Sequence, residues 1–104
     1  MPTTYRVIVT PEALDDLDRL TDWIKQSSPQ NALIVFNRLW QATQSLDTFP
    51  YRFAVRQHRR EPAKTVRAMP VSPHIIYYRI DESIHTVRVL TIRHGHQRQP
   101  RRFK

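Results

Sequence analysis

Histidine and arginine side chains are the residues of this sequence best suited to chemistry. His94 and His96 alternate around Gly95 at the end of a predicted strand, so we expect their imidazoles to share one face. An imidazole titrates near neutral pH and therefore suits proton transfer. The same spacing also fits two polar residues that only end a strand. Two imidazoles without a carboxylate or a third imidazole nearby make a poor metal site, so we expect neither a metal ion nor a cofactor.

Positive charge collects in the second half of the chain. The 104 residues include 17 Lys and Arg against 9 Asp and Glu, a net charge of +8. Residues 1–52 have a net charge of −1, and residues 53–104 have a net charge of +9. Arginine outnumbers lysine 14 to 3, and its planar guanidinium suits carboxylates and phosphates. We therefore expect an acidic partner or a nucleic acid to dock on the C-terminal half.

Two arginine clusters are candidates for this docking. Arg59 and Arg60 form the first cluster. The second lies in a basic C-terminal tail of about residues 97–104 and consists of Arg98, Arg101 and Arg102. The alternative for the tail is a solvated segment, because runs of charge are common on surfaces that bind nothing.

Composition excludes several classes of protein. The chain has no cysteine, which rules out disulfides, thiol catalysis, zinc ribbons and iron–sulfur clusters, and we expect a cytoplasmic protein. Gly95 is the single glycine, so a glycine-rich phosphate loop is excluded. No apolar run approaches the roughly 18 residues of a membrane span, and we expect no membrane partner.

Two helices are predicted in the first half. Thr10-Pro11 and Ser28-Pro29 each place a hydroxyl at an N-cap and a proline at the first helical position. Apolar residues recur at helical spacing after each start, and Phe49-Pro50 is expected to end the second helix. At most Gln26-Ser27 separates the helices, which predicts an antiparallel hairpin.

Strands flank this hairpin. Residues 5–9 form a short strand before it, and residues 51–65 have no clear period and are interpreted as an extended loop. Three further strands are predicted at residues 65–71, 74–80 and 86–93. The order β-α-α-β-β-β predicts an α+β fold in one domain, residues 1–104. The helical hairpin would pack on one face of a small, mainly antiparallel sheet.

The predicted strands are apolar on both faces. In residues 74–80, isoleucines and tyrosines point to both sides of the sheet. A helical hairpin covers one face, so the second face needs cover from the tail and loop or from a partner. Pro70 lacks an N–H group, which places its strand at a sheet edge or at a bulge.

Six short sequences resemble one family in the same order. They are YRVIVTPEALDDL at residues 5–17, SPQNA at 28–32, LDTFP at 46–50, VRAMP at 66–70, IYYRI at 76–80 and IRHGH at 92–96. Together they resemble the RelE/ParE superfamily of toxins from bacterial type II toxin–antitoxin modules, often labelled plasmid stabilisation proteins. The resemblance covers nearly the whole chain and implies the same β-α-α-β-β-β fold. It also implies a toxin held inactive by a cognate acidic antitoxin, part of which is disordered until it binds.

The superfamily contains two mechanisms. RelE-like members cut mRNA in the ribosome, whereas ParE-like members poison DNA gyrase and are not hydrolases. Cleavage through the RNA 2′-hydroxyl needs a base, an acid and cations on the phosphate. The candidates here are Arg67, Arg79, Arg93, His94 and His96.

Two departures weaken the nuclease interpretation. The family's ribonucleases carry an arginine at about the position of Ile75, and many carry an acid–base residue near the C-terminus, where this chain has Phe103. We therefore favour a ParE-like toxin that acts on DNA gyrase without being an enzyme. The alternatives are a ribosome-dependent mRNA endonuclease and a non-toxic nucleic-acid-binding domain.

Trp23 and Trp40 fall beside the main helical stripes. This position favours packing within the hairpin. The alternative is that one indole faces a groove that receives an antitoxin helix. With Arg93 and the two arginine clusters, these tryptophans are the candidate partner-binding residues.

Overall fold

The computed structural model describes residues 4–95 of the chain. Its helices are α1 (Pro11–Ser27) and α2 (Pro29–Gln44). Its strands are β1 (Arg6–Val9), β2 (Val55–Gln57), β3 (Val66–Val71), β4 (His74–Asp81) and β5 (Thr86–His94). Short 3₁₀ helices occupy Ser45–Asp47, Pro50–Arg52, Pro62–Lys64 and Glu82–Ile84.

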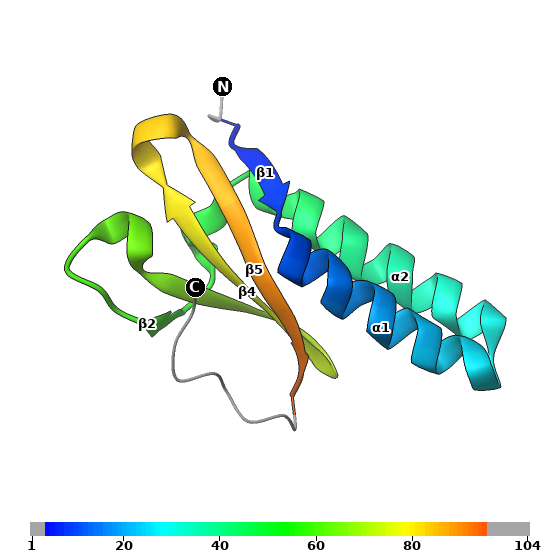
Figure 1. Cartoon of the computed structure of the whole chain (residues 1–104). Coiled ribbons are helices and arrows are strands. Elements are labelled where there is room, and N and C mark those ends of the chain that lie inside the picture. The colour runs from blue at the N-terminus through cyan, green and yellow to red at the C-terminus, as the bar shows by residue number, and fades with distance from the viewer. Residues whose placement is uncertain (1–3, 96–104) are drawn as a thin grey trace.

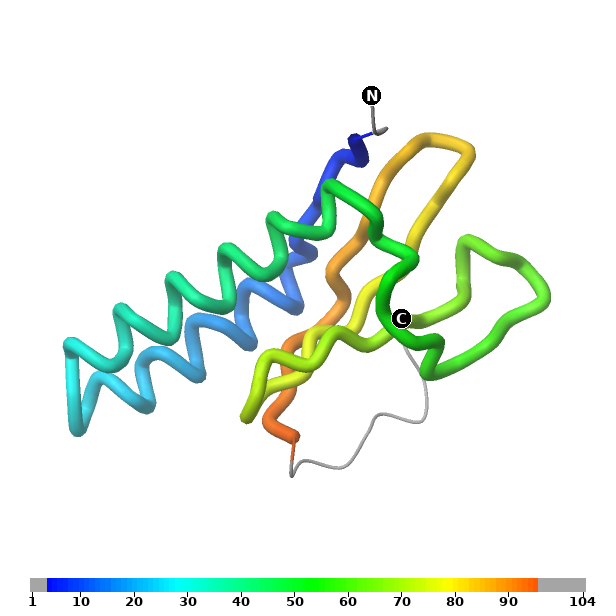
Figure 2. The backbone as a smooth tube through the Cα atoms, turned by 180° about the vertical axis from the view of Figure 1, so that it is seen from behind, coloured from blue at the N-terminus to red at the C-terminus, as the bar shows by residue number. Residues whose placement is uncertain are grey.

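The strands form one mixed sheet in the order β1-β5-β4-β3-β2. β1 runs parallel to β5, and the other neighbours are antiparallel. The two helices lie side by side on one face of the sheet (Figures 1 and 2). This confirms the predicted α+β fold, with the helical hairpin between the first strand and the rest.

The hairpin is closed by one residue. The backbone N–H of Ser28 donates to the carbonyl of Ile24 at 2.8 Å and so caps the end of α1. The Ser28 hydroxyl accepts from the N–H of Asn31 at 3.3 Å and so caps the start of α2. Both predicted helix starts are therefore confirmed, and the link is even shorter than expected.

Two details of the prediction were wrong. Residues 51–65 were expected to be loop, but they include β2, in which Val55 pairs with Arg67 of β3. A strand of three residues is too short to show an alternating pattern. The second helix ends at Gln44 rather than at Phe49-Pro50, because the chain tightens into a 3₁₀ turn that buries Leu46.

The core lies between the helices and the sheet. Leu17 of α1, Leu39 of α2 and Tyr78 of β4 are almost fully buried in it. The Tyr78 hydroxyl donates to the carbonyl of Pro50 at 2.5 Å, so this buried polar group has a partner. Burial of a side chain such as Leu17 stabilises the fold by about 1.5–3 kcal/mol.

None of the helices among residues 4–95 is long and apolar enough to cross a membrane.

A second apolar cluster lies on the opposite face. Its buried members are Val66 and Ala68 of β3, Tyr77 of β4 and Leu90 of β5. This confirms the prediction that both faces of the sheet are apolar. Pro70 is on β3, which is not an edge strand, but β2 pairs only with Val66 and Arg67, so Pro70 lies beyond its reach.

Thr10 fastens the start of α1 to β5. Its hydroxyl accepts from the N–H of Ala13 at 3.3 Å and donates to the carbonyl of Val89 at 2.7 Å. We expect Thr10→Ala to lower the free energy of unfolding by about 1–2 kcal/mol, because the N-cap and the hydroxyl bond to β5 are lost, while the backbone N–H bond to Val89 remains. Urea unfolding measures this change. Thr10→Ser keeps the hydroxyl and should stay close to wild type, and equal stability of all three proteins would contradict the role of Thr10.

Candidate functional site

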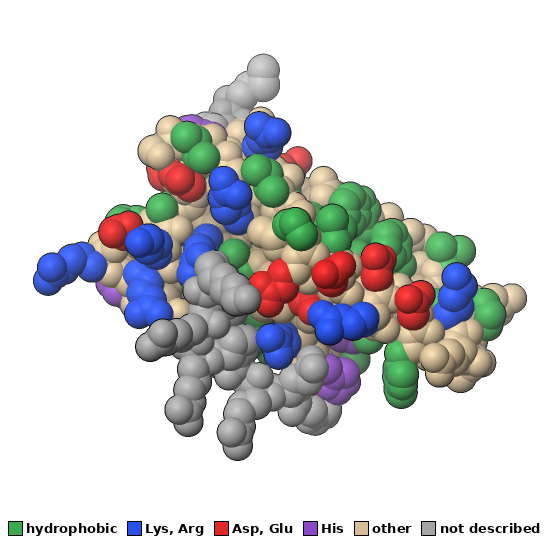
Figure 3. Space-filling model, in the orientation of Figure 1, with side chains coloured by type: hydrophobic (Ala, Val, Ile, Leu, Met, Phe, Trp, Pro, Cys, Tyr) green, Lys and Arg blue, Asp and Glu red, His purple; other side chains and the backbone are tan. Residues whose placement is uncertain are grey.

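Surface charge follows the division between helices and sheet. Figure 3 shows acidic side chains in a row over α1, and Lys and Arg gathered over the sheet and its connections. The acidic residues of α1 are Glu12, Asp15, Asp16, Asp18 and Asp22. The charge asymmetry of the sequence is therefore a difference between two layers of the molecule.

Three arginines lie on the face of the sheet that points away from the helices. Arg79 of β4 stands directly opposite Arg88 of β5, and Arg93 of β5 stands opposite Ile75, which contacts the second apolar cluster. We call Arg79, Arg88 and Arg93 the arginine face. Like charges on paired strand positions repel each other. The arrangement therefore favours an anionic partner that would relieve the repulsion.

A basic pocket lies where the connection between β2 and β3 meets the sheet. Its cavity of about 230 Å³ is lined by Arg59, Arg60 and Arg67, with His58 and Tyr51 beside them. None of the described residues that line it is acidic. Burial, and then the positive charge of Arg59, lower the pKa of Arg79.

Arg67 does not share a face with Arg79. Arg67 pairs with Tyr78, whose ring is in the main core, whereas Arg79 pairs with Val66 of the second cluster. The Arg67 guanidinium donates to the carbonyls of Tyr51 and Phe53 at 3.2 and 2.7 Å and lies over the Tyr51 ring. The two arginines are on neighbouring strands as expected, but on opposite sides of the sheet.

Arg93 and His94 lie at the other end of the sheet from Arg67. His94 pairs with His74, and Arg67 pairs with Tyr78, four residues further along β4. At about 3.3 Å per residue this separation is roughly 13 Å. The structure thus brings Arg93 and His94 together but does not bring them to Arg67.

Four predicted residues lie outside residues 4–95. They are His96 and the tail arginines Arg98, Arg101 and Arg102. Their roles in proton transfer and in docking stay predictions. Within the described part of the chain, no group of three or more His, Asp or Glu side chains is placed to hold a metal ion.

The exposure of the tryptophans differs from the prediction that both pack within the helical hairpin. Trp23 is 71% exposed, so it contributes little to the hairpin core. Trp40 is 36% exposed and stacks on Phe36 with 6.3 Å between ring centroids. Helical spacing placed both beside the apolar stripe but did not show that Trp23 points to solvent.

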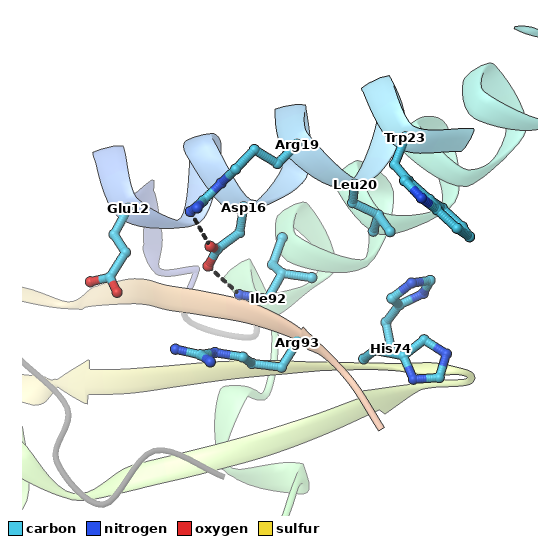
Figure 4. A pocket seen from close by; sticks show the side chains of 9 residues that line it. Glu12, Asp16, Arg19, Leu20, Trp23, His74, Ile92 and Arg93 are labelled. Carbon is cyan, nitrogen blue, oxygen red and sulfur yellow. Dashed lines mark hydrogen bonds and ion pairs between the residues drawn. The ribbon is translucent and has the colours of Figure 1, made fainter. Parts of the chain in front are cut away.

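A cleft lies between α1 and the end of β5. Its cavity of about 610 Å³ is lined by Glu12, Asp16, Arg19, Leu20, Trp23, His74, Ile92, Arg93 and His94 (Figure 4). We call it the α1–β5 cleft. It collects two of the nuclease candidates, Arg93 and His94, and one of the tryptophans.

Asp16 joins the two walls of this cleft, α1 and β5. Its carboxylate accepts from the Thr91 hydroxyl at 2.5 Å and from the N–H of Ile92 at 3.1 Å. Arg19 donates to the other carboxylate oxygen at 3.1 Å. Because Ile92 lies beyond the reach of β1, Asp16 satisfies an edge N–H that no strand would pair. The sequence does not single out Asp16, because nothing in the helical pattern distinguishes it from the other acidic residues of α1.

His74 is the buried histidine of the cleft. Only 7% of it is exposed, and its ring meets His94 edge-on with 5.6 Å between centroids. Burial, and then the charges of His94 and Arg38, lower the pKa of His74 below 6.5. A neutral imidazole is therefore favoured in the folded protein. The sequence placed His74 in a strand but did not indicate its contact with His94.

Glu82 joins three segments that are distant in sequence. Its carboxylate accepts from the Tyr51 hydroxyl at 2.6 Å and from the Tyr5 hydroxyl at 2.9 Å. These bonds lower the pKa of Glu82, while burial and then Glu82 itself raise the pKa of Tyr51 to about 12. No spacing in the sequence could indicate this cluster, because its members lie on separate elements.

Three solved structures share the fold. The chain aligns with a chain of the chromosomal ParDE toxin–antitoxin system from P. aeruginosa with a TM-score of 0.70 and 18% identity, covering 88% of this chain and 97% of that one. The toxin–antitoxin complex RelBE2 from Mycobacterium tuberculosis gives a TM-score of 0.58 and 27% identity, with 88% and 98% covered. The archaeal RelE–RelB complex from Pyrococcus horikoshii OT3 gives 0.64 and 15%, with 91% and 99% covered.

The fold is thus that of RelE/ParE-like toxins. A comparison with curated proteins by sequence gave no significant match. The family model described as "ParE toxin of type II toxin-antitoxin system, parDE" matches residues 7–99. Since this is most of the chain, the protein belongs to the ParE toxin family.

Acid should destabilise the fold through His74. The unfolded chain binds a proton at His74 more readily than the folded protein, because the folded pKa is lowered. The contribution is complete above the unfolded pKa of about 6.5 and is lost as the pH falls toward the folded value. Thermal unfolding from about pH 8 to about pH 5 should therefore show a smaller loss of stability for His74→Gln than for wild type. Parallel curves for the two proteins would exclude this role.

Removing the charge of Glu82 should lower the pKa of Tyr51. Glu82→Gln leaves the burial of the ring but takes away the carboxylate that opposes ionisation, so the shift is partial. Spectrophotometric titration of tyrosinate measures it. Glu61→Gln is the matched control, because Glu61 pairs with Lys64 on the surface. The same titration curve for wild type and both variants would argue against the cluster.

Proposed function

We propose that this toxin acts by binding and poisoning DNA gyrase, and that a cognate antitoxin neutralises it. The observation that carries the proposal is the match to the ParE family over residues 7–99. ParE-like members act on gyrase through contact, whereas RelE-like members cut mRNA. The family model therefore supports the contact mechanism.

The positions of the arginines agree with this choice. Arg67 uses its guanidinium on two backbone carbonyls, so it is already engaged without substrate. Arg79 lies on the other face, and Arg93 and His94 lie at the far end of the sheet. A general acid, a general base and a phosphate-binding cation would have to meet within hydrogen-bond reach. The described residues support docking better than such chemistry.

The runner-up is a ribosome-dependent mRNA endonuclease. The RelBE2 neighbour at 27% identity favours it, as does the proximity of Arg93 to His94 in the cleft. In that case His94 would exchange the proton, and His96 would remain a second candidate.

The antitoxin is the expected first partner. The neighbouring structures are described as a ParDE system and as RelBE complexes, which supports a cognate antitoxin for this chain. We infer that an acidic segment of it covers the arginine face and the basic pocket. The carboxylates of such a segment would reduce the repulsion between Arg79 and Arg88 and would bind Arg59 and Arg60.

Induction in a bacterium separates the two mechanisms. Gyrase poisoning predicts filamentation and a DNA-damage response within the first generations, with mRNA left whole. Rapid arrest of translation with cuts at codon-defined positions would overturn the proposal in favour of the endonuclease. Co-expression of the cognate antitoxin is the control and should abolish either effect.

Reversing one charge of the basic pocket should weaken the antitoxin complex. We expect Arg60→Glu to lower affinity about tenfold at low salt and less at high salt, because exposed charges are screened. Lys25→Glu makes the same change of charge on α1, away from the sheet, and is the matched control. Calorimetry at two salt concentrations measures both. Equal effects of the two variants would show that only net charge matters.

The tail can be tested in the same assay. Reversal of Arg98, Arg101 and Arg102 should weaken binding of the antitoxin or of gyrase if the tail docks. Unchanged affinity and unchanged toxicity would mean that the tail is only solvated.

A further inference from the structure

The α1–β5 cleft has one aromatic end and one charged end. Figure 4 shows Trp23 extending from α1 on the side of His74, and Arg93 and Glu12 toward the other end. Its volume of about 610 Å³ is within the range of sites for small organic ligands, roughly 300–1,000 Å³.

The aromatic end forms a slot for a flat ring. Trp23 is 71% exposed at its mouth, and the edge-on pair of His74 and His94 lies within the same cavity. An indole left in solvent gains from stacking on a ring, and Leu20 and Ile92 supply apolar walls. The lowered pKa of His74 keeps a neutral imidazole, which can both donate and accept a hydrogen bond. A heterocycle with donors and acceptors on its edge suits this slot.

The charged end suits one phosphate. Arg93 anchors its Nε on the Thr91 hydroxyl at 3.3 Å and also lines the cleft. Arg19 precedes Trp23 by four residues, so it lies about 6 Å back along the helix axis. The Asp16 carboxylate repels an anion less than an unpaired carboxylate would, because the Thr91 hydroxyl, the Ile92 N–H and Arg19 already donate hydrogen bonds to its oxygens.

Glu12 limits the length of the ligand. It precedes Trp23 by eleven residues, which is about 16 Å along the helix. A nucleoside monophosphate with its base at Trp23 reaches the arginines before it reaches Glu12. A triphosphate would extend toward this carboxylate and be repelled.

We propose that the α1–β5 cleft binds a nucleoside monophosphate unit, with the base on Trp23 and the phosphate on Arg93 and Arg19. The unit is either a free nucleotide or the phosphorylated end of a single strand. The cleft shares Arg93 with the arginine face, but its other lining residues belong to α1 and to the ends of β4 and β5.

Fluorescence of Trp40→Phe tests the proposal directly. This variant retains Trp23 as the single tryptophan of the chain. GMP should quench it in a saturable way, GTP should bind more weakly, and a 5′-phosphorylated single-stranded pentanucleotide tests the second source. Saturable binding of GMP or of the pentanucleotide at Trp23 supports the site. The absence of saturation by both at millimolar concentration would overturn it.

Calorimetry on variants locates the ligand. Trp23→Ala should lower the affinity for GMP about 5- to 150-fold, the range for loss of one stacked base. Arg93→Gln should weaken GMP but leave guanosine unchanged, because only the phosphate contact is lost. Leu33→Ala, an exposed apolar position on α2, is the matched control for Trp23→Ala.

Two further results would contradict the assignment. One is binding lost in Arg59→Gln but retained in Trp23→Ala, which would place the ligand in the basic pocket. The other is binding of an antitoxin peptide that Trp23→Ala abolishes while GMP fails to compete, which would make the cleft a protein-docking groove. Circular dichroism of each variant separates loss of binding from loss of fold.

Discussion

The attachment of α1 to the edge of β5 is the interaction on which the rest of the structure depends. β1 pairs with β5 only from Thr86 to Val89, so the remaining edge of β5 needs other partners. Thr10 binds the carbonyl of Val89 through both its N–H and its hydroxyl, and Asp16 binds Thr91 and the N–H of Ile92. Residues at the start of α1 therefore supply hydrogen-bond partners to the part of the β5 edge that β1 does not reach. The same contacts fix the direction of α1 and so position it as one wall of the cleft along β5.

The separation of charge follows from this architecture. The hairpin contributes apolar side chains to one face of the sheet and carries acidic residues on its outer side (Figure 3). The arginines remain for the opposite face and for the connection between β2 and β3. The pairing of Arg79 with Arg88 is unfavourable in an isolated molecule. An anionic partner would relieve this repulsion, and the antitoxin complexes among the neighbouring structures support a protein as that partner.

Local signals predicted the fold well. Thr10-Pro11 and Ser28-Pro29 marked both helix starts to the residue, and the alternation of residues 74–80 marked β4 and its two apolar faces. β2 was not predicted, because three residues are too few to show a period. The end of α2 was predicted too late, because a 3₁₀ turn buries Leu46 without continuing the helix.

Prediction of the candidate sites was weaker, because they depend on register and on contacts across the chain. The alternation of strands could not place Arg67 and Arg79 on opposite faces until the pairing of β3 with β4 was known. Arg88 became part of the arginine face only through its partner, Arg79. The contacts of Asp16 with Ile92 and of Glu82 with Tyr5 join residues 76 and 77 positions apart, and Glu82 lies 31 positions from Tyr51, so no local motif could indicate them.

The most direct test of the central claim is the effect of the purified protein on purified gyrase. The claim is that this ParE family member acts by contact with gyrase and does not cleave RNA. Supercoiled plasmid, gyrase, ATP and the toxin should yield linear DNA when the reaction is stopped with detergent and protease, and added antitoxin should prevent it. Unchanged gyrase reactions at a toxin concentration that arrests growth, together with cut mRNA in a translating extract, would contradict the claim.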